Sequence, residues 1–388
     1  MSQAVLTLNI GSSSVKASLR GAGPDDRTAI WTAHVAAIGE HAKIKRRGEA
    51  ARPAPDLVDH DAAMAWAIRE AQESAPDLTI AAVGHRIVHG GAKYAAPVAI
   101  DDRVFEELRG YISLAPNHQP HNLKGVEAAR KALPDALQVA CFDTAFHRTM
   151  PQLERLFALP RHFAREGVLR YGFHGLSYAY IASILPDHLG HAADGRVIVA
   201  HLGSGASLCA MLERRSRATT MGFTALDGPP MSTRCGSIDP GVLLHLITEG
   251  KMNAEELSDL LYNRSGLLGV SGISGDMQTL LASGDPRAEE AVELFVHHVA
   301  REIGSLAAAV EGLDAIVFTA GIGENSAPIR ARIAKHISWL GAELDESANA
   351  KGVGRINAPS SRISLHVIPT DEEGEIARET KRVLAASR

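Results

Sequence analysis

One pattern occurs twice in this chain: an apolar run, a short turn rich in glycine and serine, and a second apolar run. The first copy contains Asn9-Ile-Gly-Ser within LTLNIGSSSVK, and the second, about half the chain length later, contains His201-Leu-Gly-Ser within VIVAHLGSGAS. Two apolar runs joined by such a turn are typical of a β-hairpin. A hairpin repeated at this spacing favours an internal duplication, and 388 residues are enough for two domains.

The segments around the two hairpins alternate between predicted strands and predicted helices. Apolar runs bounded by turn residues predict strands at 5–10, 15–20, 28–38, 78–91, 136–146, 196–212 (two strands and a turn) and 313–326. Helices are predicted at 60–74, 101–112, 121–133 and 285–312. The last of these has Asp285 as its expected N-cap and Pro286 at its first helical position. Strands that alternate with helices indicate an α/β fold.

Composition and charge exclude several classes of protein. The net charge of −5 and the pI near 6.4 argue against a nucleic-acid-binding protein, which has a basic face. No window reaches the roughly 18 uninterrupted apolar residues of a membrane helix, and MSQAVLTLNI lacks the features of a signal peptide. Cys141, Cys209 and Cys235 are few and far apart, which suits a reducing compartment. We therefore expect a cytoplasmic protein that binds neither nucleic acid nor membrane.

Three predicted strands end in turns of small residues, at 9–14, 203–207 and 320–326. Backbone N–H groups in such turns can point into one space and bind phosphate, although ordinary hairpins use the same residue types. The spacings GxxxxGK[ST], GxGxxG after the first strand and GxSxG do not occur. The first turn therefore favours a phosphate-facing hairpin. Lys16 either faces that phosphate or is a solvated strand lysine.

Eleven short segments together resemble one enzyme family. In chain order they are LNIGSSSVK, GHRIVHGG, LAPNHQPHN, FDTAFH, RYGFHG, HLGSGAS, MGFTALDG, STRCGSIDPG, GLLGVSGISGDM, FTAGIGENS and PTDEE. They are similar to the acetate kinase family, within the superfamily of acetate and sugar kinases, Hsp70 and actin. Each segment alone is modest evidence, but the full series in order, from about residue 5 to residue 380, is specific.

The resemblance implies a fold, a set of ligands and an assembly. It implies two duplicated actin-like, ribonuclease H-like α/β domains with the active site in a cleft between them. The first domain would span 1–147, completed by a C-terminal helix at 375–388, and the second, nucleotide-binding domain would span 148–374. The ligands would be ATP, Mg²⁺ (or Mn²⁺) and a short carboxylate, and the protein would form a homodimer.

The resemblance also implies which residues carry out phosphoryl transfer, a reaction that depends on positioning and on positive charge around the transferred group. Arg86 and Arg234 would bind the carboxylate and the phosphoryl group through their guanidinium forks; structural salt bridges are the alternative. His174 would donate a hydrogen bond to a phosphoryl oxygen, although a lone histidine in an apolar stretch is more often a core residue. Asp143 would be catalytic, orienting an arginine and Mg²⁺.

The other implied site residues bind metal, acyl group and nucleotide. Asn9 and Glu372 match the metal positions, and the adjacent Glu373 stays open as the alternative to Glu372. The acyl substrate would contact Arg86, Val88, His118 and Phe173, and His121 lies close to His118 in the sequence. The nucleotide would contact Ser12, Ser14, Lys16, His201, Gly203, Ser204, Gly205, Gly321, Gly323 and Asn325.

The sequence departs from the family pattern at one of these nucleotide-binding residues and at two positions of the implied acyl pocket. Ser204 replaces the usual Asn of HLGNGAS, which leaves the phosphoryl donor open. Asn117 stands where Leu is usual, and Ala225 stands where Pro is usual in GFTPLEG. Loss of a proline ring opens volume, so we expect propionate or a small substituted carboxylate to be tolerated.

The leading hypothesis is therefore an acetate kinase that converts ATP and acetate to ADP and acetyl phosphate by direct in-line, reversible transfer. A propionate kinase or another short-chain carboxylate kinase is the alternative. A non-enzymatic, actin-like ATP-binding module is less favoured, because it would not need two arginines and two histidines at the γ-phosphate. The acyl chain, the physiological direction and the dimer interface stay open.

Overall fold

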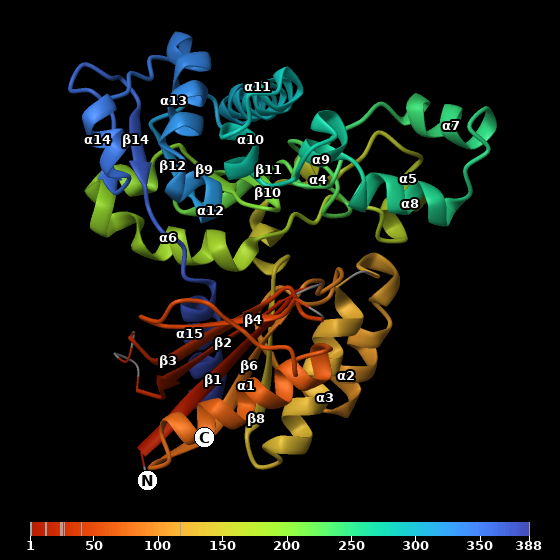
Figure 1. The fold of residues 1–388 in the computed structure, drawn as a ribbon, viewed down its shortest axis with the longest axis vertical. Coiled ribbons are helices and arrows are strands. Elements are labelled where there is room, and N and C mark those ends of the chain that lie inside the picture. The colour runs from red at the N-terminus through yellow and green to blue at the C-terminus, as the bar shows by residue number, and fades with distance from the viewer. Residues whose placement is uncertain are drawn as a thin grey trace. The chain divides into compact units, whose positions relative to one another are not determined.

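The computed structural model describes residues 2–11, 14–23, 26, 28–39, 41–116 and 118–387, so the predicted site residues Ser12 and Asn117 lie outside the described residues. The chain forms two compact units (Figure 1). Unit 1 comprises residues 1–146, 175–180 and 371–388, and unit 2 comprises residues 147–174 and 181–370. Residues 175–180 cluster with unit 1, whereas the division expected from the sequence puts them in the second domain.

Unit 1 contains a mixed β-sheet whose strands run in the order β5-β4-β3-β2-β1-β6-β8-β7. The strands β1, β6 and β8 are parallel neighbours, whereas β1 to β5 form an antiparallel meander. The bounds are β1 (Ser2–Ile10), β2 (Val15–Gly21), β3 (Ala29–Ala36), β4 (Lys43–Arg46), β5 (Arg52–Pro53), β6 (Leu78–Ile87), β7 (Val98–Ala99) and β8 (Leu137–Phe142). The first hairpin is thus β1–β2, as the sequence predicts.

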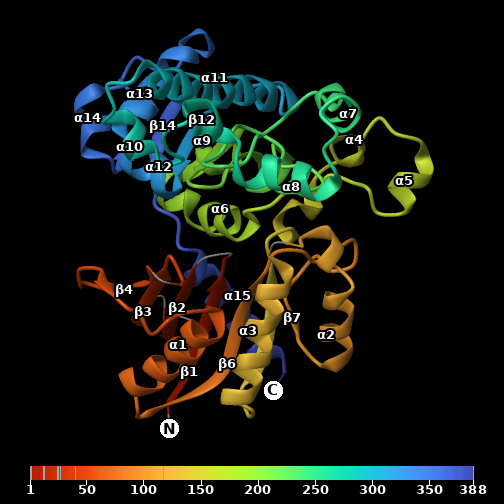
Figure 2. The same ribbon diagram turned by 45° about the vertical axis from the view of Figure 1, so that its right-hand side comes forward.

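Helices cover both faces of this sheet, because alternate residues of its strands are apolar on each side. The helices are α1 (His60–Ser74), α2 (Asp102–Arg109), α3 (Gln119–Ala132) and α15 (Glu372–Ala386). On one face, Leu8, Ile10 and Val15 pack in a core with Met64 of α1. On the other face, α15 packs against β1, β2, β6 and β8 (Figures 1 and 2).

Unit 2 repeats the strand arrangement of unit 1. Its sheet runs in the order β11-β10-β9-β12-β14-β13. The bounds are β9 (Val197–Leu202), β10 (Ala206–Leu212), β11 (Arg215–Thr219), β12 (Ala315–Thr319), β13 (Gly354–Arg355) and β14 (Ser364–Val367). The meander β9-β10-β11 corresponds to β1-β2-β3, and the parallel neighbours β9, β12 and β14 correspond to β1, β6 and β8. The duplication that the repeated hairpin predicts is therefore present in the fold.

Unit 2 also contains a series of helices. They are α4 (Gln152–Arg155), α5 (Arg161–Arg165), α7 (Pro240–Thr248), α8 (Ala254–Asn263), α9 (Gly266–Ser271), α10 (Met277–Leu281), α11 (Pro286–Ala309), α12 (Ala320–Asn325), α13 (Ala327–His336) and α14 (Glu346–Lys351). In addition, α6 (Gly175–Leu189) begins in unit 1 and ends in unit 2. The long helix α11 packs against β9, β10 and β11. In the part of the chain that the structure describes, no helix combines the length and apolar character needed to cross a membrane.

Most predicted elements are present, and one prediction is wrong. The helix predicted at 60–74 is α1, and Asp285 caps α11 with Pro286 at its start. The third small-residue turn, predicted at 320–326, is instead the short helix α12. The chain enters this helix through Ala320, which has a positive φ of 65°. The carboxylate of Glu324 accepts a hydrogen bond from the Ala320 N–H at 2.8 Å, which stabilises the first helical turn.

Candidate functional site

Three predicted site residues of unit 1 lie at the same edge of its sheet. Asn9 is near the carboxyl end of β1, Arg86 is near the carboxyl end of β6, and Asp143 directly follows β8. These strands are parallel neighbours, and Arg86 is in register with Cys141 of β8. Ligands of open α/β sheets bind at the carboxyl ends of parallel strands, so this edge is the candidate site of unit 1.

Arg86 and Asp143 form a buried ion pair. The Nε and Nη2 atoms of Arg86 both donate to Oδ2 of Asp143, at 2.9 and 2.6 Å. The Asp143 side chain is 1% exposed and the Arg86 side chain 15%. Burial raises the pKa of Asp143, and the Arg86 guanidinium partly offsets that rise. Burial alone lowers the pKa of Arg86, but Asp143 and Glu372 raise it above its usual value, so the arginine stays charged.

Asn9 is held by two carboxylates at the start of α15. Its Nδ2 donates to Oε2 of Glu372 at 2.9 Å and to Oε1 of Glu373 at 3.1 Å. Burial raises the pKa of Glu373, Lys16 lowers it, and Glu372 raises it further. Two carboxylates and an amide are the hard oxygen donors that Mg²⁺ prefers, and Mg²⁺ takes few protein ligands. The residues therefore fit such an ion, and both glutamates lie within reach of Asn9.

Other predicted residues of unit 1 have contacts within their own segments or with neighbouring helices. The Val88 N–H donates to Oδ1 of Asn122 at 3.0 Å, which fixes the chain after β6. His118 is the N-cap residue of α3. His121, its neighbour in the sequence, instead stacks on His60 with 4.5 Å between the ring centroids. The carbonyl of Ser14 accepts from the Gly11 N–H at 2.8 Å and so closes the first hairpin.

In unit 2, four predicted residues lie together around the second hairpin. The rings of His174 and His201 stack with 4.1 Å between their centroids. A Cβ atom on Gly205 would lie 2.8 Å from Nη2 of Arg234 and 3.1 Å from Nε2 of His174. A side chain at position 205 would therefore push both groups away. Nη1 of Arg234 donates to the carbonyl of Ala225 at 2.8 Å, which fixes the position of the guanidinium.

The predicted nucleotide residues of unit 2 lie on the β9–β10 turn and on the short helix α12. The Gly203 N–H donates to the carbonyl of Gly205 at 3.1 Å and closes the β9–β10 turn. A Cβ atom on Gly203 would lie 3.6 Å from Cβ of Ala320 and 3.9 Å from the backbone nitrogen of Gly321, so the start of α12 is beside this turn. The backbone of Gly323 is similarly close to Phe318 of β12. The predicted residue Asn325 is exposed, and its amide donates to the Gly321 carbonyl at 2.8 Å.

Ser204, the departure in this turn, is exposed, and its carbonyl accepts from the Ser232 N–H at 3.2 Å. The segment that carries Arg234 is therefore tied to the β9–β10 turn through a backbone contact that does not involve the Ser204 side chain.

Two residues that the sequence did not predict, Ser207 and His147, contact predicted site residues. Oγ of Ser207 lies 2.8 Å from Nδ1 of His174. His147 is fully buried, with Nε2 2.9 Å from the Phe173 carbonyl and Nδ1 2.9 Å from Oγ of Ser216. A carbonyl only accepts, so Nε2 of His147 carries the proton. Both residues belong to quoted segments, HLGSGAS and FDTAFH, but their partners are distant in the sequence.

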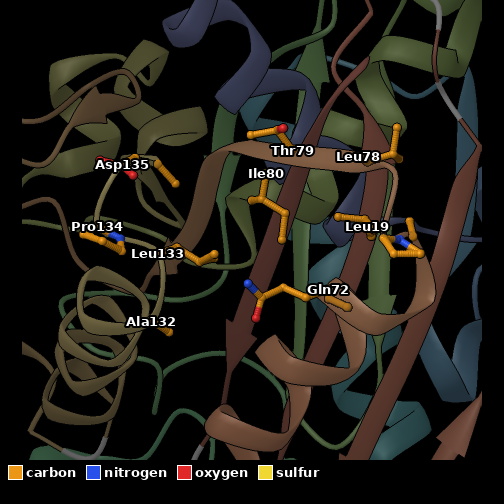
Figure 3. Close-up of a pocket in the computed structure, with 13 residues that line it drawn as sticks. Leu19, Gln72, Leu78, Thr79, Ile80, Ala132, Leu133, Pro134 and Asp135 are labelled. Carbon is orange, nitrogen blue, oxygen red and sulfur yellow. The ribbon is translucent and has the colours of Figure 1, made fainter. Parts of the chain in front are cut away.

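One cavity of unit 1 lies at the end of its sheet opposite to Asn9, Arg86 and Asp143 (Figure 3). Its volume is about 370 Å³, and its lining includes Gln72 at the end of α1, Leu78 and Ile80 at the start of β6, and Leu133 after α3. Arg86 is at the opposite end of β6. The cavity contains none of the predicted site residues and is not part of the candidate site.

The model of the acetokinase family matches residues 4–378 of the chain. The chain belongs to the acetokinase family. The chain is 53% identical to the acetate kinase of Rhodopseudomonas palustris (strain TIE-1), with both chains covered completely. It also resembles the crystal structure of a propionate kinase from Francisella tularensis, with a TM-score of 0.90, 33% identity and coverage of 98% of this chain and 100% of the other. The acetate kinase of Porphyromonas gingivalis gives a TM-score of 0.85 at 36% identity, with coverage of 98% and 100%.

The family match assigns the chain to the kinases that transfer a phosphoryl group to a carboxyl group. The actin-like α/β fold predicted from the sequence is confirmed, since the solved relatives have it. The predicted acyl-pocket residues belong to both units. Val88 is a buried residue of unit 1, and Phe173 is a buried residue of unit 2. Ala225, also in unit 2, is the residue whose carbonyl binds Arg234.

Proposed function

We propose that this protein is an acetate kinase that transfers the γ-phosphoryl group of ATP to acetate, giving ADP and acetyl phosphate, in a reversible reaction. The observation that carries the proposal is the match to the acetokinase family over residues 4–378, with relatives named acetate kinase at about half identity over the full length. A propionate kinase is the second candidate, because a solved relative of that name has a TM-score of 0.90.

In the proposed mechanism, acetate attacks directly. Its carboxylate is already ionised at pH 7, so no general base is needed. An acetate oxygen forms a bond to the γ-phosphorus in line with the breaking bond, and ADP leaves with the electron pair of that bond. Arg86 binds the anionic reactants, and Asp143 holds its guanidinium in place through two hydrogen bonds to one oxygen.

The proposal gives the cluster of unit 2 the task of stabilising the transferred group. Arg234 supplies positive charge, and His174 donates a hydrogen bond from Nε2 to a phosphoryl oxygen. The contact between Ser207 and Nδ1 of His174 supports this role, because the serine can donate to Nδ1 and so leave the proton on Nε2. The glycine turns, with His201 and Ser204, bind the nucleotide phosphates, and α12 lies against the nucleoside.

Asn9 and Glu372, or Glu373 in place of Glu372, would hold Mg²⁺ or Mn²⁺, which neutralises phosphate charge when bound. The packing of two carboxylates around one amide supports this assignment, because a divalent cation relieves their mutual repulsion. The experiment that separates Glu372 from Glu373 is the dependence of the rate on Mg²⁺ concentration. Glu372→Gln and Glu373→Gln are compared, and the ligand is the residue whose replacement raises the Mg²⁺ requirement more.

We also propose a cytoplasmic homodimer. The helix α7 exposes Val242, Leu244 and Ile247, and Ile238 before it is exposed as well. An apolar surface of this kind is typical of an interface. The three cysteines are free, which suits a reducing compartment. Sedimentation of the wild type and of Leu244→Glu tests the interface.

The function itself is tested by trapping acyl phosphate with hydroxylamine, using ATP, Mg²⁺ and acetate, propionate or butyrate. Hydroxamate formed from acetate at the highest kcat/KM supports an acetate kinase, and a preference for propionate supports the second candidate. No hydroxamate with any carboxylate contradicts both. A phosphoryl group trapped on Asp143 or Glu372 contradicts direct transfer.

A further inference from the structure

A row of basic side chains crosses three strands of unit 1 on the face that carries α15. In the β2–β3 ladder Lys16 is paired with His34, and in the β3–β4 ladder His34 is paired with Lys45. Directly paired residues lie side by side on one face of a sheet. Their sequence neighbours Val15 and Ile44 are in the apolar core of the opposite face. The row is therefore on the α15 face, where α15 packs against β1 and β2 rather than β4.

This part of the face is hollowed into a cavity of about 320 Å³. It is built mainly from residues of β2, β3 and β4 and from the start of α15. Half of its lining residues are basic and two are acidic; the lining comprises Lys16, Ala17, Ser18, Arg20, Thr32, Ala33, His34, Lys45, Arg46, Arg47, Asp371 and Glu373. The cavity is thus large enough for a small organic ion.

Two of the basic side chains have carboxylate partners of their own. Nη2 of Arg20 lies 2.7 Å from Oδ2 of Asp371. Nη2 of Arg46 lies 2.5 Å from Oε2 of Glu70 on α1. Paired charges of this kind largely cancel, so neither arginine leaves a full charge for a ligand.

Two other basic side chains keep their charge available. Within the described residues, Lys45 has no hydrogen bond or ion pair, and the guanidinium of Arg47 donates only to the carbonyl of Ala29, at 3.0 Å. Burial lowers the pKa of His34, and the positive charges of Lys16 and Lys45 lower it further. The electrostatic potential along this row of side chains is therefore positive. Two cations without carboxylate partners at one cavity indicate an anionic ligand.

We propose that this cavity binds a small polyanion, a molecule with two or more carboxylate or phosphate groups, through Lys45, Arg47 and the neighbouring His34. A single charge would engage only one of the two cations, whereas a polyanion engages both. The site is a second one, distinct from the candidate site for ATP and carboxylate, and goes beyond the proposed function. It borders that site through Lys16 and Glu373, which line the cavity and lie beside Asn9.

Calorimetric titration of the full-length protein tests the site at low ionic strength without metal or nucleotide. Citrate is the carboxylate probe and tripolyphosphate the phosphate probe. The double variant Lys45→Ala/Arg47→Ala removes the two available cations, and we expect it to bind the preferred probe about tenfold more weakly. Lys43→Ala is the control for position: it removes one positive charge from β4, the strand of Lys45, at a residue outside the cavity, whereas the double variant removes two charges from the cavity.

Binding of either probe that the double variant weakens and Lys43→Ala retains supports the site, and the preferred probe identifies carboxylate or phosphate as the ligand chemistry. Three outcomes overturn it: neither probe binds at millimolar concentration, the double variant binds as the wild type does, or Lys43→Ala loses as much affinity. The ADP affinity of the double variant should equal that of the wild type, which shows that the fold is intact. Because binding is measured without substrates, the result is independent of the hydroxamate assay.

Discussion

The ion pair of Arg86 and Asp143 can be compared with a second pair of the same geometry. In both, Nε and Nη2 of an arginine donate to a single carboxylate oxygen: Arg86 to Asp143 at 2.9 and 2.6 Å, and Arg46 to Glu70 at 3.1 and 2.5 Å. Both pairs belong to unit 1. They differ in burial, since the Asp143 side chain is 1% exposed and the Glu70 side chain 22%. Arg46 also lies 3.5 Å from the carboxylate of Glu49. The variants Asp143→Asn and Glu70→Gln therefore compare a buried pair with a more exposed one whose arginine keeps a second partner.

We expect Asp143→Asn to lower the free energy of unfolding by about 3 kcal/mol, because it leaves a mostly buried guanidinium without a counter-charge. This value is at the lower end of the range for breaking a buried ion pair. The Arg86 side chain is partly exposed to solvent, and the negative charges of Glu372 and Glu373 still stabilise its positive charge. For Glu70→Gln we expect about 1 kcal/mol or less. A difference of about 2 kcal/mol corresponds to roughly a 30-fold change in the ratio of folded to unfolded protein.

Urea unfolding followed by circular dichroism measures the stabilities, and the hydroxamate assay measures activity at a temperature where both variants are folded. If Asp143 orients Arg86 for catalysis, Asp143→Asn should lower kcat by about 10³-fold, whereas Glu70→Gln should stay near wild type. Equal losses of stability in the two variants would refute the argument from burial. Near-normal kcat in folded Asp143→Asn would refute the positioning role.

Three further predictions follow from other contacts. Gly205→Ala should lower kcat by about 10²-fold or more with little change in stability, because its Cβ displaces the flexible end of Arg234; Gly284→Ala, which has open space around it, should leave kcat unchanged in the same assay. Burial lowers the pKa of His147 to about 4. As the pH falls, the unfolded state therefore takes up a proton on His147 before the folded state does. The stability that the neutral ring contributes above pH 6.5 is lost as the pH falls towards 4. The stability difference between the wild type and His147→Gln should shrink by about 2 kcal/mol between pH 7 and pH 5 in urea unfolding; a constant difference would contradict the neutral ring. Finally, Ala225→Pro should lower kcat/KM for propionate relative to acetate, and an unchanged ratio would contradict the role of this position in acyl selectivity.

The sequence predicted the fold where local signals and the core agree. The helix at 60–74 has an aspartate N-cap and a continuous apolar face, and its bounds were predicted correctly. The repeated hairpin predicted the duplication, which the two strand orders confirm. The segment at 320–326 was predicted wrongly, because glycine and serine favour turns locally. Its helical form depends on Glu324, whose side chain also accepts from the Thr370 N–H at 3.1 Å, a contact between residues distant in the sequence.

For the candidate site, the sequence predicted the residues but not the contacts between them. The residue types and the family resemblance pointed to Arg86, Asp143, His174 and Arg234, but only the register of β6 and β8 shows that Arg86 reaches Asp143. The choice between Glu372 and Glu373 could not be made from the sequence, and both contact Asn9 in the structure. Neighbouring residues at the start of a helix can both reach one strand end, and no spacing rule distinguishes them.

The separation in sequence between α15 and the strands that it covers has a consequence for synthesis on the ribosome. The strands of unit 1 lie within residues 2–142, whereas α15, which packs on one face of their sheet, begins at Glu372 and is made after the strands of unit 2. Val5 and Ala82 pack in one apolar cluster with Ala377, and Val139 packs in another with Ile376, so these side chains lack their partners until α15 is translated. Domains at the N-terminus of a protein commonly fold first during synthesis. In this protein the sheet of unit 1 gains its contacts with α15 only after the strands of unit 2 have been made.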